Sequence, residues 1–210
     1  DWPLCYGSVI PPLNGPMLLE YSHRLAASMV SVLVLTVAVL TWWRYLTERW
    51  LLLPATIGVL LLVGVIVLGG ITVLMELPPL TVAAHFAIAQ ALLASMVTVY
   101  VVTQSRYKDS GVEHVLVSTG NGFPKLALAM LVLTYVVLLS GSYVMASGAS
   151  SACADWPLCQ GGILPQGVLT LLHMAHRYLT LPMAALAILL IVGAWRHRRE
   201  RPALALTSCW

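Results

Sequence analysis

Charged side chains are scarce in this sequence. Asp, Glu, Lys and Arg together make up 9% of the 210 residues, whereas hydrophobic residues make up 60%. Because soluble domains carry roughly 25% charged residues, this chain lacks the means to build an ordinary water-facing surface. The formal net charge of +3 is also too small, and too clearly sorted by loop, to indicate nucleic acid as a partner. The composition therefore indicates an integral membrane protein.

Uninterrupted apolar runs divide the chain into candidate spans. Several runs exceed the roughly 18 residues that mark a membrane-crossing helix. We predict an all-α polytopic membrane protein with five transmembrane helices, at about residues 20–43, 51–75, 79–104, 123–146 and 167–195. The first residues, Asp1-Trp2-Pro3, lack the basic start and the apolar core of a signal peptide.

Basic residues are absent from every second connection. Residues 1–19, 76–80 and 147–166 contain no Lys or Arg, whereas the other connections and the C-terminal tail each contain basic residues. The positive-inside rule then places the N-terminus and the cysteine loops outside and the C-terminus in the cytoplasm. Of the eleven basic residues, only Arg24 and Arg177 depart from this pattern, because they lie just inside outer helix ends. Their position indicates a specific role.

The pentapeptide DWPLC occurs twice, at residues 1–5 and 155–159, and each copy precedes a His-Arg pair, His23-Arg24 or His176-Arg177. Agreement in motif, order and spacing indicates a duplicated unit. Before the second copy, Cys153 completes a C-x5-C pair on the oxidising face, where a disulfide can close the loop; two unrelated thiols are the alternative. The helix and cysteine that the repeat expects before residue 1 are missing. We therefore expect either the middle of an eight-helix protein or a natural short variant.

Four histidines lie inside the predicted spans: His23, His85, His173 and His176. Ionisable residues within a membrane are costly, and their usual role is functional. His23 and His85 each lie one to two turns after the outer start of a helix, so the two rings reach a similar depth. Two imidazoles at one level can hold a haem iron between them. The simpler alternative is a histidine that forms a hydrogen bond between helices.

Three further residues are candidates for the same sites. Glu20 lies one turn before His23, so its carboxylate can address the same cavity and exchange protons there, although an ordinary acid at a helix N-terminus is the alternative. The guanidinium groups of Arg24 and Arg177 suit the propionates of haem. His173 replaces Glu20 in the second repeat and is either a ligand or a partner behind a ligand.

These motifs in combination resemble the haem A synthase family over nearly the whole chain. They are the C-x5-C pair with DWPLC, the Glu-x-x-His-Arg helix start, the run Leu68-Gly69-Gly70-Ile71-Thr72-Val73-Leu74 that leads to His85, and Leu139-Ser140-Gly141-Ser142-Tyr143-Val144. The resemblance implies two pseudo-symmetric four-helix bundles, here truncated at both ends, each with a bis-histidine haem site. It also implies oxidation of the C8 methyl group of haem O to a formyl group, which gives haem A for terminal oxidases.

The resemblance also assigns roles to the candidates. It implies that His23 and His85 flank the iron of the substrate, haem O, with Glu20 as the acid–base group, and that His176 is a ligand of a haem b cofactor. Cys153 and Cys159 would form the outer disulfide of the second half, and Cys5 would be half of the first, its partner being absent from the chain. The helix with the second haem b ligand is also absent, so that site is incomplete unless another chain or His173 supplies a ligand.

We expect four parts in the chain: a first-repeat bundle for the substrate haem (1–104), a cytoplasmic loop (105–122), a second-repeat bundle for the cofactor haem (123–195) and a basic tail (196–210). The expected location is a prokaryotic plasma membrane. Expected partners are membrane lipid and the haem substrate, with haem O synthase, an oxidase assembly factor or a second copy of the chain as candidates. Rival functions are a haem b-binding electron-transfer subunit, which has no need of Glu20, and a thiol–disulfide oxidoreductase, which leaves the histidines unexplained.

Overall fold

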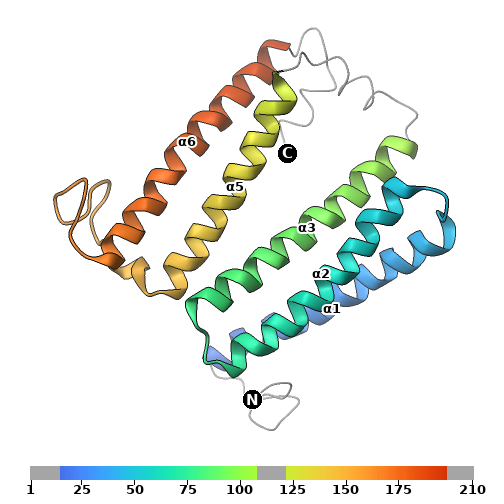
Figure 1. Cartoon of the computed structure of the whole chain (residues 1–210), viewed down its shortest axis with the longest axis horizontal. Helices are drawn as coiled ribbons and strands as arrows, with labels where there is room; N and C mark the ends of the chain where they lie inside the picture. Colours follow the sequence, from blue (N-terminus) through green and yellow to red (C-terminus); the bar gives the residue numbers. More distant parts are fainter. Residues whose placement is uncertain (1–14, 108–121, 198–210) are drawn as a thin grey trace. The chain divides into compact units, whose positions relative to one another are not determined.

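Helices account for the regular structure of the chain. The computed structural model describes residues 15–107 and 122–197. Its elements are α1 (Gly15–Arg44), α2 (Arg49–Leu74), α3 (Pro79–Tyr107), α5 (Phe123–Ala146), the 3-10 helix η1 (Ala149–Ser151) and α6 (Val168–His197) (Figure 1). The described ranges contain no strand, only an isolated bridge between Cys159 and Gly162. The all-α fold with five long helices is confirmed; Cys5 and most of the predicted cytoplasmic loop and tail lie outside the described residues.

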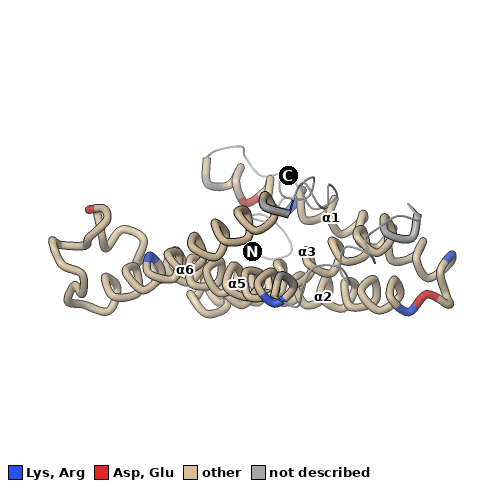
Figure 2. Tube along the Cα trace, turned by 90° about the horizontal axis from the view of Figure 1, so that it is seen from above, with Lys and Arg blue, Asp and Glu red and all other residues tan. Residues whose placement is uncertain are grey.

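Each of the five long helices is long and apolar enough to cross a membrane. The best window of each has a mean hydropathy between 1.9 and 2.8. In Figure 2 most of the length of every helix is free of charged residues, which gather near helix ends. Large apolar side chains such as Leu60 and Trp43 lie largely exposed, at 68% and 78%. Side chains of this kind are stable when lipid covers them.

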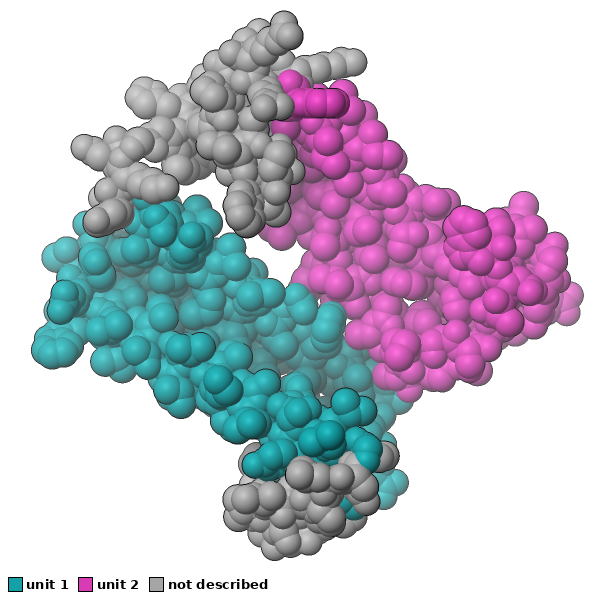
Figure 3. Space-filling view, turned by 180° about the vertical axis from the view of Figure 1, so that it is seen from behind, with its two compact units in different colours: residues 1–104 teal, residues 105–210 magenta. Residues whose placement is uncertain are grey.

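The chain divides into two compact units, residues 1–104 and 105–210 (Figure 3). In unit 1, three helices contribute one side chain each to a buried cluster: Val34 from α1, Leu62 from α2 and Leu92 from α3. A second cluster, formed by Leu51, Ala55 and Val99, joins α2 to α3. These clusters fix the faces on which the three helices meet.

Polar contacts reinforce the packing of unit 1. The Ser95 hydroxyl of α3 donates a hydrogen bond to the Pro54 carbonyl of α2 over 2.6 Å. The indole N–H of Trp42 in α1 donates to the Thr56 hydroxyl of α2 over 3.0 Å. Inside a membrane the association of helices depends on such close packing and hydrogen bonds, because lipid removes the hydrophobic driving force between them.

The connection between α2 and α3 is a tight helix end. Glu76 has φ 60°, in the left-handed region, and its N–H bonds the Val73 carbonyl while the Leu77 N–H bonds the Thr72 carbonyl. This pair of bonds is the Schellman pattern, which satisfies the last carbonyls of a helix. Pro78 follows, and α3 begins at Pro79. The chain therefore reverses direction within a few residues and brings α3 back along α2.

Unit 2 consists of α5, η1, α6 and the loop between η1 and α6. The two long helices pack along each other, and η1 contacts both. Gly148, with φ 74°, ends α5 and turns the chain into η1. The following loop carries the second DWPLC segment and returns to α6 at Val168. The loop and the first turns of α6 are thus neighbours in space as well as in sequence.

Candidate functional site

The first turns of α1 hold three of the predicted site residues of unit 1. Glu20 and Arg24 lie four residues apart, and Glu20 Oε1 forms an ion pair with Arg24 Nη2 at 2.5 Å. His23 lies on the adjoining part of the same turn and is exposed, as is Glu20. Residues at this spacing occupy one side of a helix. The carboxylate is therefore held one turn from the imidazole and remains accessible.

His85 of α3 lies closely against the backbone of α2. A Cβ atom placed on Gly69 would lie 3.0 Å from His85 Cε1 and 3.3 Å from Nδ1. Only a glycine lets the ring approach so closely. His85 Nδ1 is buried and has no hydrogen-bond partner within the described residues, and a buried polar atom without a partner is costly. The glycine thus lets the ring pack closely against α2, where Val65 also gives it a backbone hydrogen bond.

His23 of α1 and His85 of α3 lie within electrostatic range of each other in unit 1. Their rings are near enough for a charge on one to act on the other. His23 lies eight residues after the first residue of α1 and His85 six residues after that of α3, which corresponds to about 12 and 9 Å along the helices. Two imidazoles from different helices at comparable depths fit the ligand set of a haem iron. The residues present therefore fit a haem group in unit 1.

His176 of α6 has a matching cradle on α5. A Cβ atom on Gly141 would lie 3.1 Å from His176 Cε1. Unlike His85, His176 has a partner for Nδ1, because the Ser140 hydroxyl oxygen lies 2.8 Å away. The ring is partly buried. A histidine whose Nδ1 is held by a hydrogen bond and whose ring packs against a glycine is suited to bind a haem iron, as His85 is.

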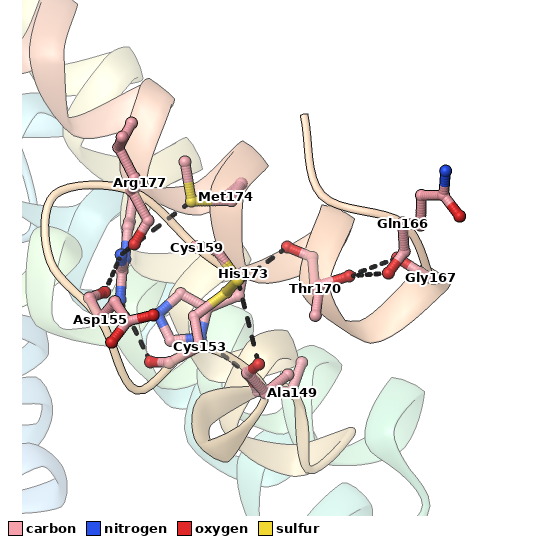
Figure 4. The surroundings of a disulfide bond; sticks show 12 residues. Ala149, Cys153, Asp155, Cys159, Gln166, Gly167, Thr170, His173, Met174 and Arg177 are labelled. Atoms are coloured by element: carbon pink, nitrogen blue, oxygen red, sulfur yellow. Dashed lines mark hydrogen bonds between the residues drawn. A yellow bond between two sulfur atoms is a disulfide. The ribbon is translucent and has the colours of Figure 1, made fainter. Parts of the chain in front are cut away.

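The outer loop of unit 2 is closed by the predicted disulfide. Cys153 and Cys159 are bonded, with Cα atoms 5.1 Å apart, and the prediction is confirmed. Met174 of α6, 2% exposed, packs against the two cysteines in a buried cluster. The Tyr178 hydroxyl donates to the Ile163 carbonyl of the same loop. Met174 and Tyr178 therefore fasten the loop to α6 on both sides of His176; Figure 4 shows the disulfide beside Met174.

Arg177 contacts the disulfide loop. Its Nη1 donates to the carbonyls of Asp155, Pro157 and Leu158 over 2.7, 3.3 and 3.2 Å, and its Nη2 donates to the Cys153 carbonyl over 3.3 Å (Figure 4). In the first repeat the equivalent Arg24 pairs with Glu20, whereas Arg177 has His173 at that position. The roles of Arg24 and Arg177 toward propionates stay predictions.

His173 is also tied to this end of unit 2. Its Nδ1 lies 2.9 Å from the Ala149 carbonyl of η1. A carbonyl oxygen only accepts, so His173 donates through an Nδ1–H in this contact. The residue therefore helps to hold η1 against α6. Whether it also serves as a ligand, or stands behind one, stays a prediction.

Sequence reasoning missed the residues behind the histidines. Gly69, Ser140 and Gly141 lie in the two runs that carry the family resemblance, yet the patterns alone give them no role. Their role depends on which faces of neighbouring helices meet. The available signal is a small residue in an apolar helix that packs beside a histidine-bearing helix, because small residues mark close helix approach.

The helices and histidines define a class of protein: a polytopic helical membrane protein with glycine-backed histidines in its spans. Comparison with known proteins narrows the class. Residues 14–210 match the model of the COX15-CtaA family, described as cytochrome oxidase assembly protein. The chain belongs to this family. It is an integral membrane protein.

Curated relatives of the chain are haem A synthases. The haem A synthases of Bacillus licheniformis and Alkalihalophilus pseudofirmus are each 31% identical to it, over 96% and 95% of this chain and 67% of their own length. The haem A synthase of Symbiobacterium thermophilum is 31% identical over 100% of this chain and 69% of its own length. The chain thus spans about two thirds of the length of these relatives.

Proposed function

We propose that this chain acts in haem A biosynthesis and carries the substrate site for oxidation of the C8 methyl group of haem O to a formyl group. The observation that carries the proposal is that His23 and His85 lie within electrostatic range of each other in unit 1, with the Glu20 carboxylate one turn from His23. The names of the relatives, haem A synthases, support a role in making haem A. The predicted electron-transfer role accounts for the histidines but gives Glu20 no task.

Each residue has a part in this proposal. His23 and His85 bind and orient the iron of the substrate haem O, and the Gly69 backbone sets the plane of the His85 ring. Arg24 holds the Glu20 carboxylate in place through their ion pair. Glu20 takes up a proton that leaves the substrate carbon and passes it to water, because its side chain is exposed.

His176 of unit 2 is the proposed ligand of a haem b cofactor, which when bound would relay electrons from the substrate. Conversion of a methyl to a formyl group removes four electrons from the carbon. With water as the oxygen donor, R–CH3 and H2O give R–CHO, four protons and four electrons. The electrons pass to an external electron acceptor. His176 contributes to this step by holding the relay, with Ser140 and Gly141 behind it.

The test is production of haem A by the chain and its Glu20→Gln variant. The chain is expressed with haem O supplied, and the haems are extracted and identified. Glu20→Gln keeps the size of the side chain but removes its proton-accepting charge, so we expect retained haem and a loss of formyl product of about 100-fold or more. Glu76→Gln, an exposed acid in the α2–α3 connection, is the matched control and should be neutral.

Three results would contradict the proposal in different ways. Equal turnover in Glu20→Gln and the unaltered chain would remove Glu20 from the reaction. Haem b in the extract with no haem A, both for this chain and for one extended to the length of its relatives, would favour the electron-transfer function. Absence of haem from the intact chain would remove the bis-histidine site.

A further inference from the structure

Ser140 makes two contacts that together fix a proton. Its hydroxyl oxygen lies 2.9 Å from the Val137 carbonyl of the preceding turn and 2.8 Å from His176 Nδ1. A hydroxyl has one hydrogen, and a carbonyl only accepts. When the hydrogen points at Val137, the serine oxygen can only accept from His176, so Nδ1 must carry a hydrogen. The lone pair of the neutral ring is then on Nε2.

The reverse arrangement satisfies the contacts less well. If the hydroxyl donated to His176 Nδ1, the serine and Val137 oxygens would face each other at 2.9 Å without a hydrogen between them. The ring hydrogen would then be on Nε2, where it would block ligation. Both contacts are satisfied at once only in the arrangement that leaves Nε2 free to bind a metal.

Gly141 fixes the plane of the same ring. The contact of 3.1 Å between a Cβ at Gly141 and His176 Cε1 leaves no room for a side chain. The dipeptide Ser140-Gly141 therefore sets two properties of one histidine: the serine sets its tautomer, and the glycine sets its distance from α5. Both residues act from a neighbouring helix, so the ring is held at two points.

The histidine of unit 1 has only half of this arrangement. Gly69 backs His85 as Gly141 backs His176. Ser140 directly precedes Gly141, whereas the residue before Gly69 is Leu68, which has no hydroxyl. His85 instead has a backbone hydrogen bond with Val65, while its buried Nδ1 has no hydrogen-bond partner in the part of the chain that the structure describes. Both rings thus pack against a glycine, but only His176 has a serine hydroxyl beside it.

We propose that Ser140 is a positioning residue that makes His176 a strong and permanent haem ligand, because its hydroxyl oxygen accepts a hydrogen bond from the His176 Nδ1–H. The proposal rests on the proposed function, in which unit 2 keeps a cofactor and unit 1 turns over a substrate. An acceptor at Nδ1–H fixes the ring and raises the basicity of Nε2, and loss of such a partner typically weakens metal affinity about 10- to 100-fold.

The first test needs no haem. The whole chain is labelled with [15N]histidine in lipid nanodiscs, and the NMR shifts of the ring nitrogens of His176 report its tautomer. We expect a hydrogen on Nδ1 in the unaltered chain and in Ser140→Thr, which keeps a hydroxyl. Ser140→Ala should give a tautomer mixture. Ser142→Ala is the matched control, because Ser142 bonds only the Leu139 carbonyl among the contacts found, and it should leave His176 unchanged.

The second test uses ferric haem b as the probe. In a His23→Ala, His85→Ala background, bound haem reports on unit 2. We expect Ser140→Ala to weaken haem binding about 10- to 100-fold and to make the midpoint potential more positive, since a less basic ligand favours ferrous iron. Ser140→Thr should restore both readouts, and Ser142→Ala should match the background chain.

The outcomes separate the proposal from the function on which it rests. A His176 tautomer that is unchanged by Ser140→Ala, or equal haem affinity and potential in Ser140→Ala and Ser142→Ala, would overturn the role of Ser140. Unaltered haem binding after His176→Ala would instead overturn the ligand role of His176, and with it the proposed cofactor site.

Discussion

At the scale of single residues, Gly69 and Gly141, which pack against His85 and His176, are the positions where a larger side chain would be least tolerated. A Cβ atom added at either glycine would lie 3.0–3.1 Å from the ring of a histidine on the next helix, which is tighter than an ordinary van der Waals contact. A methyl group added there must displace either the ring or the helix backbone. Because close packing tolerates little extra volume, the histidine is the group that would move.

Gly69→Ala should therefore impair unit 1. The added Cβ would lie 3.0 Å from His85 Cε1, and overpacking of this kind costs about 1–3 kcal/mol. We expect less haem retained at His23 and His85, measured by the absorbance of the purified protein, and a lower melting temperature.

Gly64→Ala is the control for this prediction. It lies on the same helix and faces the same partner helix, but its Cβ would lie 3.7 Å from Ile88, an ordinary contact. The substitution should be neutral or slightly stabilising, because alanine favours a helix by about 1 kcal/mol over glycine. Equal haem retention in the two variants would show that the Gly69 contact does not position His85.

At the scale of elements, the first turns of α6 fasten the disulfide loop. Arg177, Met174 and Tyr178 all contact this loop, and His173 contacts η1. A guanidinium group suits this task because it presents several N–H groups in a fixed plane. A lysine at the same position would present a single ammonium group.

Arg177→Lys should loosen the loop while keeping the charge. Hydrogen bonds to a charged group contribute about 1.5–3 kcal/mol each, so loss of one raises the population of the open loop about tenfold. We expect reduction of the Cys153–Cys159 disulfide by an added thiol to become about tenfold faster, followed by alkylation and mass spectrometry. Arg44→Lys, at the end of α1 in the other unit, serves as control. Equal reduction rates in the two variants would contradict a role of Arg177 in holding the disulfide loop.

The sequence predicts the helices well because their apolar runs are long. The first and last residues of each helix are harder to predict. Helix α5 begins and ends where the pattern predicts, whereas α1 begins at Gly15, five residues before the predicted start. Pro16 is compatible with the first turn of a helix, so the helix can begin ahead of the apolar run. The sequence predicted His23 and His85 from depth alone. Gly69 and Ser140 escaped because a linear pattern does not show which faces of two helices touch.

At the scale of the whole molecule, the distribution of basic residues predicts an orientation. Arg44 and Arg49 flank the α1–α2 connection, whereas the α2–α3 connection and the disulfide loop have no Lys or Arg. The membrane-spanning helices agree with this reading but leave the sidedness as a prediction. The positive-inside rule places the disulfide loop outside.

Cysteine labelling in intact cells checks this orientation. One variant keeps only Cys153 and Cys159, and a second keeps only Cys209. After reduction, a membrane-impermeant maleimide should label the first variant in intact cells and the second only after the membrane is opened. The opposite pattern would reverse the predicted topology.

The contacts between α6 and the disulfide loop also restrict how the helix can move. A helix among lipids keeps two easy motions, rotation about its axis and sliding along it. The contacts of His173, Met174, Arg177 and Tyr178 with the loop and η1 oppose both motions at one level. His176 lies within that stretch, so the loop and η1 set the rotation and the axial position of the helix at His176. The disulfide loop thus holds the His176 ring, the proposed haem ligand, at a fixed position and angle in α6.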